Sequence, residues 1–169
     1  MRAVVIEPPG EDQGDHRTEF PVRLPDAKAL AVKLIAHHPS LADWRVTFTW
    51  RCRRNLGRCF YSTRTIRLSV PFVARNMPEI VTELVLHEVA HALVGPGHGH
   101  GPIWQAKATA LGIAPSRYFR KGLMPPGEFQ ATCRACRRTF HFYARPVKER
   151  WCRCGGPNAE RLSFARVTA

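Results

Sequence analysis

Four of the chain's eight histidines lie within one short segment, LHEVAHALVGPGHGHGPIW, which runs from Leu86 to Trp104. His87, Glu88 and His91 form an H-E-x-x-H motif within it. On a helix, residues four positions apart lie on one face, so both imidazoles can bind the same metal ion. A carboxylate at the second position can then take a proton from metal-bound water. The motif predicts a catalytic zinc site that needs a third protein ligand.

The third ligand must come from outside the motif, and the glycine-rich turn after it offers His98 and His100. Spacing alone leaves both open. The metzincin pattern H-E-x-x-H-x-x-G-x-x-H is excluded, because Val94 and Gly97 occupy its later glycine and histidine positions. A chance match on an ordinary helix is the alternative to zinc. It is disfavoured because two histidines and a carboxylate on an otherwise apolar helix destabilise it unless a partner compensates them.

Six cysteines divide into a cluster of four and a separate pair. The cluster has the order C-x-x-C, fifteen residues, C-x-C, and its members are Cys133, Cys136, Cys152 and Cys154. This spacing is close to that of a four-thiolate zinc ribbon, so we expect a structural zinc site rather than disulfides or scattered buried thiols. The N-terminus has no long apolar segment typical of a signal peptide, which favours a reducing compartment. We expect Cys52 and Cys59 to be unpaired or buried.

The net charge of +13 is concentrated in two blocks. Residues 44–78 contain eight Arg and no acidic residue, and residues 114–169 contain twelve basic and three acidic residues. Such blocks attract phosphate backbones irrespective of sequence. Codon bias toward Arg would be the alternative, but it would not remove the acids. The predicted DNA contacts are Arg51, Arg53, Arg54, Arg58, Arg134, Arg137, Arg138 and Arg153.

Aromatic residues interleave with the second basic block, at Phe140, Phe142, Tyr143 and Trp151. Cations beside aromatic rings suit single-stranded or distorted DNA without sequence specificity. The same rings could instead form the small core of a module, and for Phe140 and Trp151 we favour that interpretation.

Periodicity predicts the elements that position these groups. We expect a helix capped by Asp26 and ended by Pro39, and a buried helix that carries the motif. Between them we expect two alternating strands at 44–51 and 64–70 that pair antiparallel, with a turn at Gly57. Asn76 with Glu79 resembles a capping box for that helix, with Pro78 in its first turn and Gly95 at its end. A shorter helix should follow His100.

The fold class is therefore α+β, with a small antiparallel sheet packed on the H-E-x-x-H helix and flanking helices, followed by a small zinc-ribbon-like module. We expect a flexible leader at 1–24, a catalytic domain at 25–122, a linker at 123–128 and the zinc module at 129–169.

The run HEVAHAL…GHGPIW resembles the SprT-like (Spartan-related) zinc metalloprotease family. In that family the motif is followed by Gly-His-Gly-Pro and an aromatic residue, which Gly99–Pro102 and Trp104 match, so the resemblance nominates His100 as the third ligand. The upstream runs NLGRCFYSTRTIRLSVPFV and PEIVTELVLHE are similar to the family's strand pair and helix entry. The resemblance extends over residues 26–120 and also implies a C-terminal zinc-binding module.

These observations predict a zinc-dependent endopeptidase recruited to DNA that cleaves DNA-bound or DNA-crosslinked proteins, with Glu88 as general base. We expect one catalytic and one structural zinc ion, a monomer, no membrane association and a cytoplasmic, nucleoid-associated location (the host cytoplasm if the source is viral). Arg117 and Tyr118 are candidate oxyanion stabilisers. One alternative is a nucleic-acid-binding zinc protein with a structural or inactive H-E-x-x-H site. Another is a zinc peptidase of soluble substrates with no DNA role.

Overall fold

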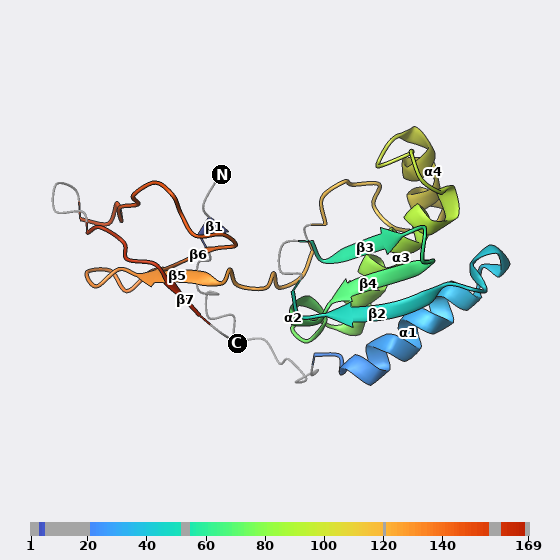
Figure 1. Ribbon diagram of the computed structural model, residues 1–169, viewed down its shortest axis with the longest axis horizontal. Helices are drawn as coiled ribbons and strands as arrows, with labels where there is room; N and C mark the ends of the chain where they lie inside the picture. Colours follow the sequence, from blue (N-terminus) through green and yellow to red (C-terminus); the bar gives the residue numbers. More distant parts are fainter. Residues whose placement is uncertain (1–3, 6–20, 52–54, 120, 156–159, 168–169) are drawn as a thin grey trace, which may run out of the picture. The chain divides into compact units, whose positions relative to one another are not determined.

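The computed structural model describes residues 4–5, 21–51, 55–119, 121–155 and 160–167. The chain divides into two compact units, one formed by residues 17–125 and the other by residues 1–16 together with 126–169 (Figure 1). Each unit contains a β-sheet of its own. Within the described residues, every helix is too short or too polar to cross a lipid bilayer.

The first unit combines helices with a three-stranded sheet, which confirms the predicted α+β class. Its helical elements are α1 (Leu24–Ala36), the 3₁₀ turn η1 (Pro39–Leu41), α2 (Val70–Val73), α3 (Pro78–Val94) and α4 (Pro102–Ala110). Its strands are β2 (Arg45–Thr49), β3 (Gly57–Phe60) and β4 (Thr65–Ser69).

The sheet has the order β2-β4-β3 and is mixed rather than antiparallel. β2 runs parallel to β4, with Val46 opposite Ile66, so the predicted antiparallel pairing of 44–51 with 64–70 is wrong. The antiparallel partner of β4 is β3, which begins at the glycine that was predicted to form a turn. β3 forms one edge of the sheet, and β4 then returns between β3 and β2. β4 is therefore antiparallel to β3 and parallel to β2.

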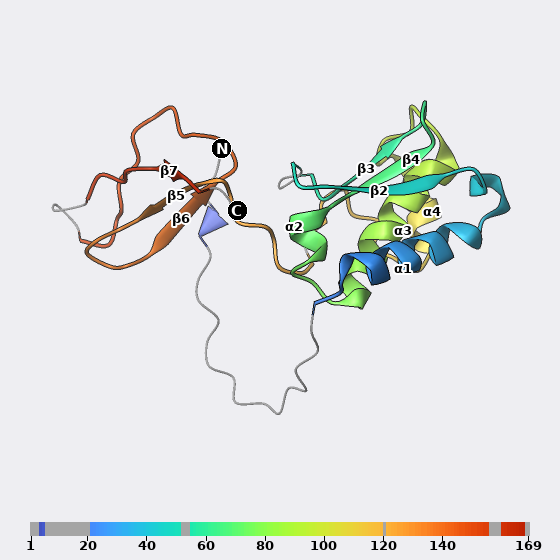
Figure 2. The same ribbon diagram turned by 60° about the horizontal axis from the view of Figure 1, so that its bottom comes forward.

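Helices α1 and α3 cover one face of this sheet (Figure 2). Ile66 and Leu68 of β4 have no exposed surface and belong to the same core cluster as Val85 and Val89 of α3. Ala31 of α1, also fully buried, joins this cluster. Burying several such side chains supplies the main stabilisation of the unit, at roughly 1.5–3 kcal/mol for each large aliphatic group.

The ends of the helices differ in part from the predictions. Asp26 lies in the first turn of α1, where it accepts a hydrogen bond from Arg23 Nε at 2.8 Å, and it does not cap the helix. The capping box at Asn76 is also wrong, because Met77 is the N-cap residue of α3 and makes no side-chain cap bond. Pro78 does occupy the first turn, and Gly95, with a φ of 79°, ends the helix as predicted.

Asn76 instead joins two distant segments. Its side chain is buried and donates to the carbonyl oxygens of Phe72 at 2.7 Å and Leu123 at 3.0 Å, while its Oδ1 accepts from the Leu123 amide at 2.6 Å. Gly122, at a φ of 80°, approaches so closely that a Cβ atom there would collide with the Asn76 amide. Asn76 therefore fixes the segment after α4 against the start of α3.

The second unit contains a small antiparallel sheet of order β1-β6-β5-β7. Its strands are β1 (Val4–Val5), β5 (Phe129–Thr132), β6 (Thr139–Phe142) and β7 (Ala165–Arg166). β1 lies in the segment that the sequence predicted as a flexible leader, and it pairs with β6. The core of the unit contains Cys133 and Cys152, both buried.

The bonds of Asn76 lead to a stability prediction. We expect Asn76→Ala to lower the free energy of unfolding by about 1–3 kcal/mol, because the buried Phe72 carbonyl and the Leu123 backbone lose the partner that the Asn76 side chain provides. Urea denaturation of the full chain measures the change. Arg75→Ala, an exposed neighbour, is the control and should change stability by less than about 0.5 kcal/mol. Equal stability of the two variants would contradict the assignment.

Candidate metal centre and active-site cleft

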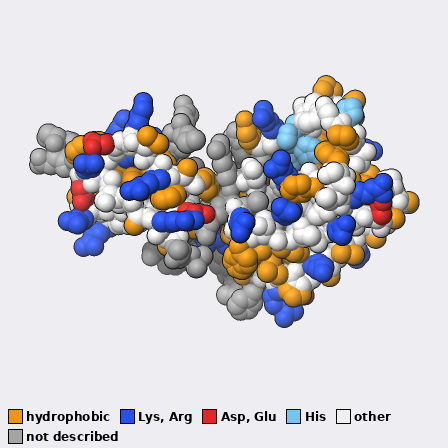
Figure 3. Space-filling view, in the orientation of Figure 1, with side chains coloured by type: hydrophobic (Ala, Val, Ile, Leu, Met, Phe, Trp, Pro, Cys, Tyr) orange, Lys and Arg blue, Asp and Glu red, His pale blue; other side chains and the backbone are white. Residues whose placement is uncertain are grey.

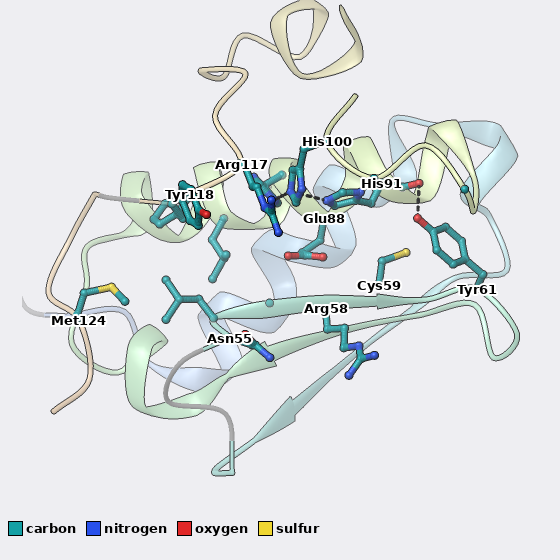
Figure 4. A pocket seen from close by; sticks show the side chains of 17 residues that line it. Asn55, Arg58, Cys59, Tyr61, Glu88, His91, His100, Arg117, Tyr118 and Met124 are labelled. Carbon is teal, nitrogen blue, oxygen red and sulfur yellow. Dashed lines mark hydrogen bonds between the residues drawn. The ribbon is translucent and has the colours of Figure 1, made fainter. Parts of the chain in front are cut away.

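Three imidazoles meet beside α3, and they come from the three histidines that the motif and the resemblance nominate. His87 Nε2 lies 3.1 Å from His100 Nε2, and His91 Nε2 lies 3.0 Å from it. The three ligand atoms all lie within 4.8 Å of one another (Figure 4). Zinc–nitrogen bonds of about 2.0–2.1 Å in a tetrahedron place neighbouring nitrogens about 3.3 Å apart. The arrangement therefore fits one face of a tetrahedral zinc site.

The glycine-rich turn brings His100 back to the helix. α3 ends at Gly95, and both Gly97 and Gly99 adopt positive φ angles, 90° and 50°, that other residues rarely adopt. His98 is exposed and does not belong to the metal-binding group. Of the two histidines that spacing left open, the structure thus places His100 with the motif.

Trp104 of α4 packs against all three imidazoles. Its side chain is fully buried, and its ring centroid lies 4.7, 5.2 and 4.6 Å from the centroids of His87, His91 and His100 respectively. A rigid indole against all three rings restricts their rotamers. The aromatic residue after the Gly-His-Gly-Pro run therefore has a structural role, which is to pack against the three histidines.

Burial keeps the histidines neutral. It lowers the pKa of His87 to about 3 and that of His91 to about 4, with the neighbouring imidazoles adding to the effect. The pKa of His100 is also lowered, first by burial and then by the nearby Arg117 guanidinium. Neutral imidazole is the form that binds metal, so the ring nitrogens can coordinate an ion without first releasing protons.

Glu88 lies on the same helix with its carboxylate directed into the cleft (Figure 4). Only 5% of the residue is exposed, and burial raises the pKa of its carboxyl group to about 8. The β3 backbone contacts it, because a Cβ atom built at Gly57 would lie 2.5 Å from Glu88 Oε1. Glycine at this position is what lets the sheet edge pack on the carboxylate.

A cleft of about 990 Å³ opens over these groups. Arg117 and Tyr118, the predicted oxyanion candidates, line it. Sequence reasoning missed three further lining residues from β3 and the turn after it, namely Gly57, Cys59 and Tyr61. These residues alternate along the chain, and alternate residues of a strand share a face. That pattern was not used because the segment was interpreted as a turn.

Cys59 and Tyr61 carry polar groups that stay protonated. Burial, followed by the charge of Glu88, raises the pKa of the Cys59 thiol to about 12. Burial and the nearby Cys59 raise the pKa of the Tyr61 hydroxyl to about 12. That hydroxyl donates to the backbone oxygen of His91 at 3.3 Å. Cys59 is a free, half-buried thiol, as expected, whereas Cys52 lies outside the described residues.

The four clustered cysteines form a second metal-binding group in the other unit. Cys133 Sγ lies 3.6 Å from Cys154 Sγ, and Cys136 Sγ lies 3.6 Å from Cys152 Sγ. All four sulfurs lie within 4.8 Å of one another. Zinc–sulfur bonds of about 2.3 Å in a tetrahedron place sulfurs about 3.8 Å apart, so the group fits a four-thiolate zinc site despite the short C-x-C spacing.

The predicted DNA-contacting arginines occur in both units. Arg51 and Arg58 are exposed in the first unit, and Arg53 and Arg54 lie outside the described residues. In the second unit all four predicted residues are exposed, and Arg134 also contacts Glu160 at 3.7 Å. In the space-filling view, basic side chains lie over the sheet of the first unit close to the pale-blue histidines (Figure 3). The four second-unit residues are Arg134, Arg137, Arg138 and Arg153.

Comparison with known proteins agrees with the geometry. The model of the SprT-like family matches residues 29–122. The DNA-dependent metalloprotease dvc-1 of Caenorhabditis elegans is 28% identical over 155 residues. That alignment covers 83% of this chain but 38% of the relative, so the chain spans well under half of the relative's length.

The contact between β3 and the carboxylate leads to a second prediction. Replacing a strand glycine with alanine normally stabilises a protein by reducing the entropy of the unfolded chain. We expect the opposite for Gly57→Ala, a loss of about 1–3 kcal/mol, because the new methyl group collides with Glu88. Thermal and urea unfolding measure the change.

A double-mutant cycle supplies the control. Combining Gly57→Ala with Glu88→Ala removes the collision, so the two effects should be strongly non-additive. Additive effects, or a stabilising Gly57→Ala, would show that β3 does not pack on the carboxylate.

Proposed function

The chain belongs to the SprT-like metalloprotease family, and from that premise we propose that it is a zinc-dependent endopeptidase recruited to DNA, where it cleaves bound or crosslinked proteins. One observation carries the hydrolytic part of the proposal. Three imidazole nitrogens converge beside a buried carboxylate at the floor of an open cleft. A structural zinc site would not need either the carboxylate or the cleft.

His87, His91 and His100 would hold the catalytic ion, and the four clustered cysteines would hold a structural one. When bound by three protein ligands, zinc polarises a carbonyl group and lowers the pKa of water toward about 7. The cysteine unit has a very small core, to which Cys133 and Cys152 themselves belong. Metal binding would therefore contribute directly to the folding of that unit.

Glu88 would act as the general base. Its carboxylate accepts a proton from the attacking water and passes it to the leaving amine nitrogen as the peptide bond breaks. The low-dielectric surroundings that raise its pKa increase its affinity for the proton. The positive charge of an ion at the histidines would lower that pKa again, so that the carboxylate is ionised when catalysis begins.

Cationic and hydroxyl groups at the cleft would assist this reaction. Arg117 lies beside His100 (Figure 4), where it could stabilise negative charge that develops on the scissile carbonyl oxygen. Tyr61 lies on the other side of the cleft, where its hydroxyl donates its single proton to the backbone oxygen of His91. Its contribution would be to hold the end of α3 that carries His91, while Arg117 faces the substrate.

Recruitment to DNA is supported by charge and by the comparison. The relative from Caenorhabditis elegans is described as a DNA-dependent metalloprotease. This chain has a net charge of +13 and exposed arginines in both units. Cations at such density bind phosphate backbones without regard to base sequence. DNA would then hold protein substrates at a high local concentration near the cleft.

Cleavage assays test the catalytic proposal. We expect the chain to cleave a DNA-binding protein in the presence of DNA, and Glu88→Gln to lower that rate by about 100-fold or more, because the general base is lost. Gel electrophoresis with and without single- and double-stranded DNA measures the cleavage.

Zinc content of the Glu88→Gln variant is the control and should equal that of the parent chain. Cleavage at the same rate with and without DNA would support the peptidase activity but contradict the proposed recruitment to DNA. Equal cleavage by both proteins would remove Glu88 from the mechanism.

Metal analysis tests the two proposed zinc sites separately. We expect about two zinc ions per chain by mass spectrometry, and about one after His100→Ala, because two imidazoles alone bind zinc weakly. His98→Ala removes the neighbouring exposed histidine and should retain both ions. Loss of an ion from the His98 variant, or retention of both by the His100 variant, would reverse the ligand assignment.

A further inference from the structure

Strand β3 separates two surfaces of the first unit. Gly57 and Cys59 face the cleft beside Glu88. Arg58 and Phe60 alternate with them and therefore project from the opposite face of the sheet. Arg58 also contributes to the lining of the cleft, but its side chain points away from Glu88 (Figure 4). α1 and α3 pack on the other face of the sheet, and among the described residues no helix of the core cluster covers this one (Figure 2).

Arginines and one aromatic ring gather on this opposite face. Arg58 of β3 and Arg67 of β4 are direct cross-strand partners. Their guanidinium carbons lie 5.2 and 4.5 Å from the centroid of the Phe60 ring, which is half-buried. Arg45 of β2 is exposed in the adjoining row, level with Thr65 and Phe60. We call the surface formed by Arg45, Arg58, Phe60 and Arg67 the arginine face.

The charges on the arginine face are not neutralised by neighbouring carboxylates. Like charges directly opposite each other destabilise a pair of strands. Among the residues that the structure describes, Arg45, Arg58 and Arg67 form no ion pair. Arg64, in the turn between β3 and β4, does pair with Asp43. An anionic ligand would remove the repulsion that remains on the face.

We propose that the arginine face binds single-stranded DNA, with its arginines on phosphates and the Phe60 ring beside a base. The proposal rests on the proposed function, because it specifies where the DNA partner of the peptidase lies. A polyanion matches three cations without ion-pair partners on one face of the sheet. An aromatic ring flanked by guanidinium groups favours exposed bases over a duplex, whose bases are stacked inside.

The position of this face determines which proteins can reach the cleft. β3 is an edge strand of the sheet, with the cleft on one side and the arginine face on the other. DNA on the arginine face would therefore lie one strand's thickness from the cleft. A protein attached to that DNA needs to pass only over the free edge of β3 to present a peptide to Glu88.

Binding measurements in the Glu88→Gln background test the proposal without interference from cleavage. The test variant is Arg45→Ala with Arg67→Ala. The matched control, Lys28→Ala with Lys33→Ala, removes the same charge from exposed positions on α1. Fluorescence anisotropy with a labelled oligothymidine, over a series of salt concentrations, gives the affinity and its salt dependence.

We expect the test variant to lower the affinity about tenfold or more, and to lower the slope of log affinity against log salt by about 1.4, since two phosphate contacts are lost at about 0.7 each. The control should change both quantities much less. Equal effects of the two double variants would overturn the proposal, because they would show only a general response to net charge.

Phe60→Leu tests the stacking contact. We expect about fivefold weaker binding to oligothymidine, an unchanged salt slope and no change in binding to a blunt duplex. Ultraviolet crosslinking to oligothymidine, followed by peptide mapping, should identify the peptide that contains Phe60. Crosslinks confined to the second unit, or an equal loss of duplex binding, would overturn the assignment to single-stranded DNA on this face.

The outcomes separate this proposal from the proposed function. If the Glu88-containing chain cleaves no DNA-bound protein while the binding results hold, the peptidase assignment is wrong and the arginine face stands. If the chain cleaves proteins with DNA stimulation while the double variant binds normally, the arginine face is wrong and the proposed function stands.

Discussion

The full or partial burial of four ionisable groups on and beside one apolar helix is the constraint on which the first unit depends. Removing a charged group from water is strongly unfavourable unless it is neutralised or paired. Accordingly, burial lowers the pKa of His87 and His91 and raises the pKa of Glu88, so the site favours neutral side chains. Neutral imidazoles expose lone pairs, and three of them point at one place. The same desolvation therefore prepares the ligands for a cation and gives the carboxylate a high affinity for a proton.

The surrounding elements can be understood as supports for this arrangement. α3 ends one turn after His91, so the chain can reverse direction and bring His100 back beside α3. Trp104 then fills the space beneath all three rings. Asn76 holds the segment that leads to the cleft residues Arg117 and Tyr118. These supports come from different elements of the first unit, so the geometry of the site depends on the fold of that unit.

Local patterns predicted the chemistry of the site better than they predicted the architecture. The H-E-x-x-H motif and the cysteine spacing carry their own geometry, because helical periodicity and tight turns place the ligands. His100 could not be chosen over His98 by spacing, and it required either the family resemblance or the fold of the turn. The caps at Asp26 and Asn76 failed because other groups bind the same side chains, a local one at Asp26 and both local and distant ones at Asn76. Arg23 donates to the Asp26 carboxylate, and the Asn76 amide donates to the backbone oxygens of Phe72 and Leu123.

Strand order was the least predictable feature, for a physical reason. Alternation identified β2 and β4 as strands but contains no information about which neighbour each would choose. The periodicity analysis missed β3 because it is short and begins with a glycine that signals a turn, although the run that resembles the family's strand pair contains it. In the structure that glycine is needed for a different purpose, to admit the Glu88 carboxylate against the strand.

The same strand illustrates how a single short element can serve two surfaces. Because side chains alternate, β3 can carry small or polar groups toward a cleft and cationic or aromatic groups toward solvent without compromise between them. Gly57 and Cys59 contribute to the first surface, and Arg58 and Phe60 to the second. A shift of one residue in the pairing of β3 would exchange the two sets and place an arginine against Glu88. The antiparallel register with β4 therefore determines both the geometry of the cleft and the charge of the opposite face.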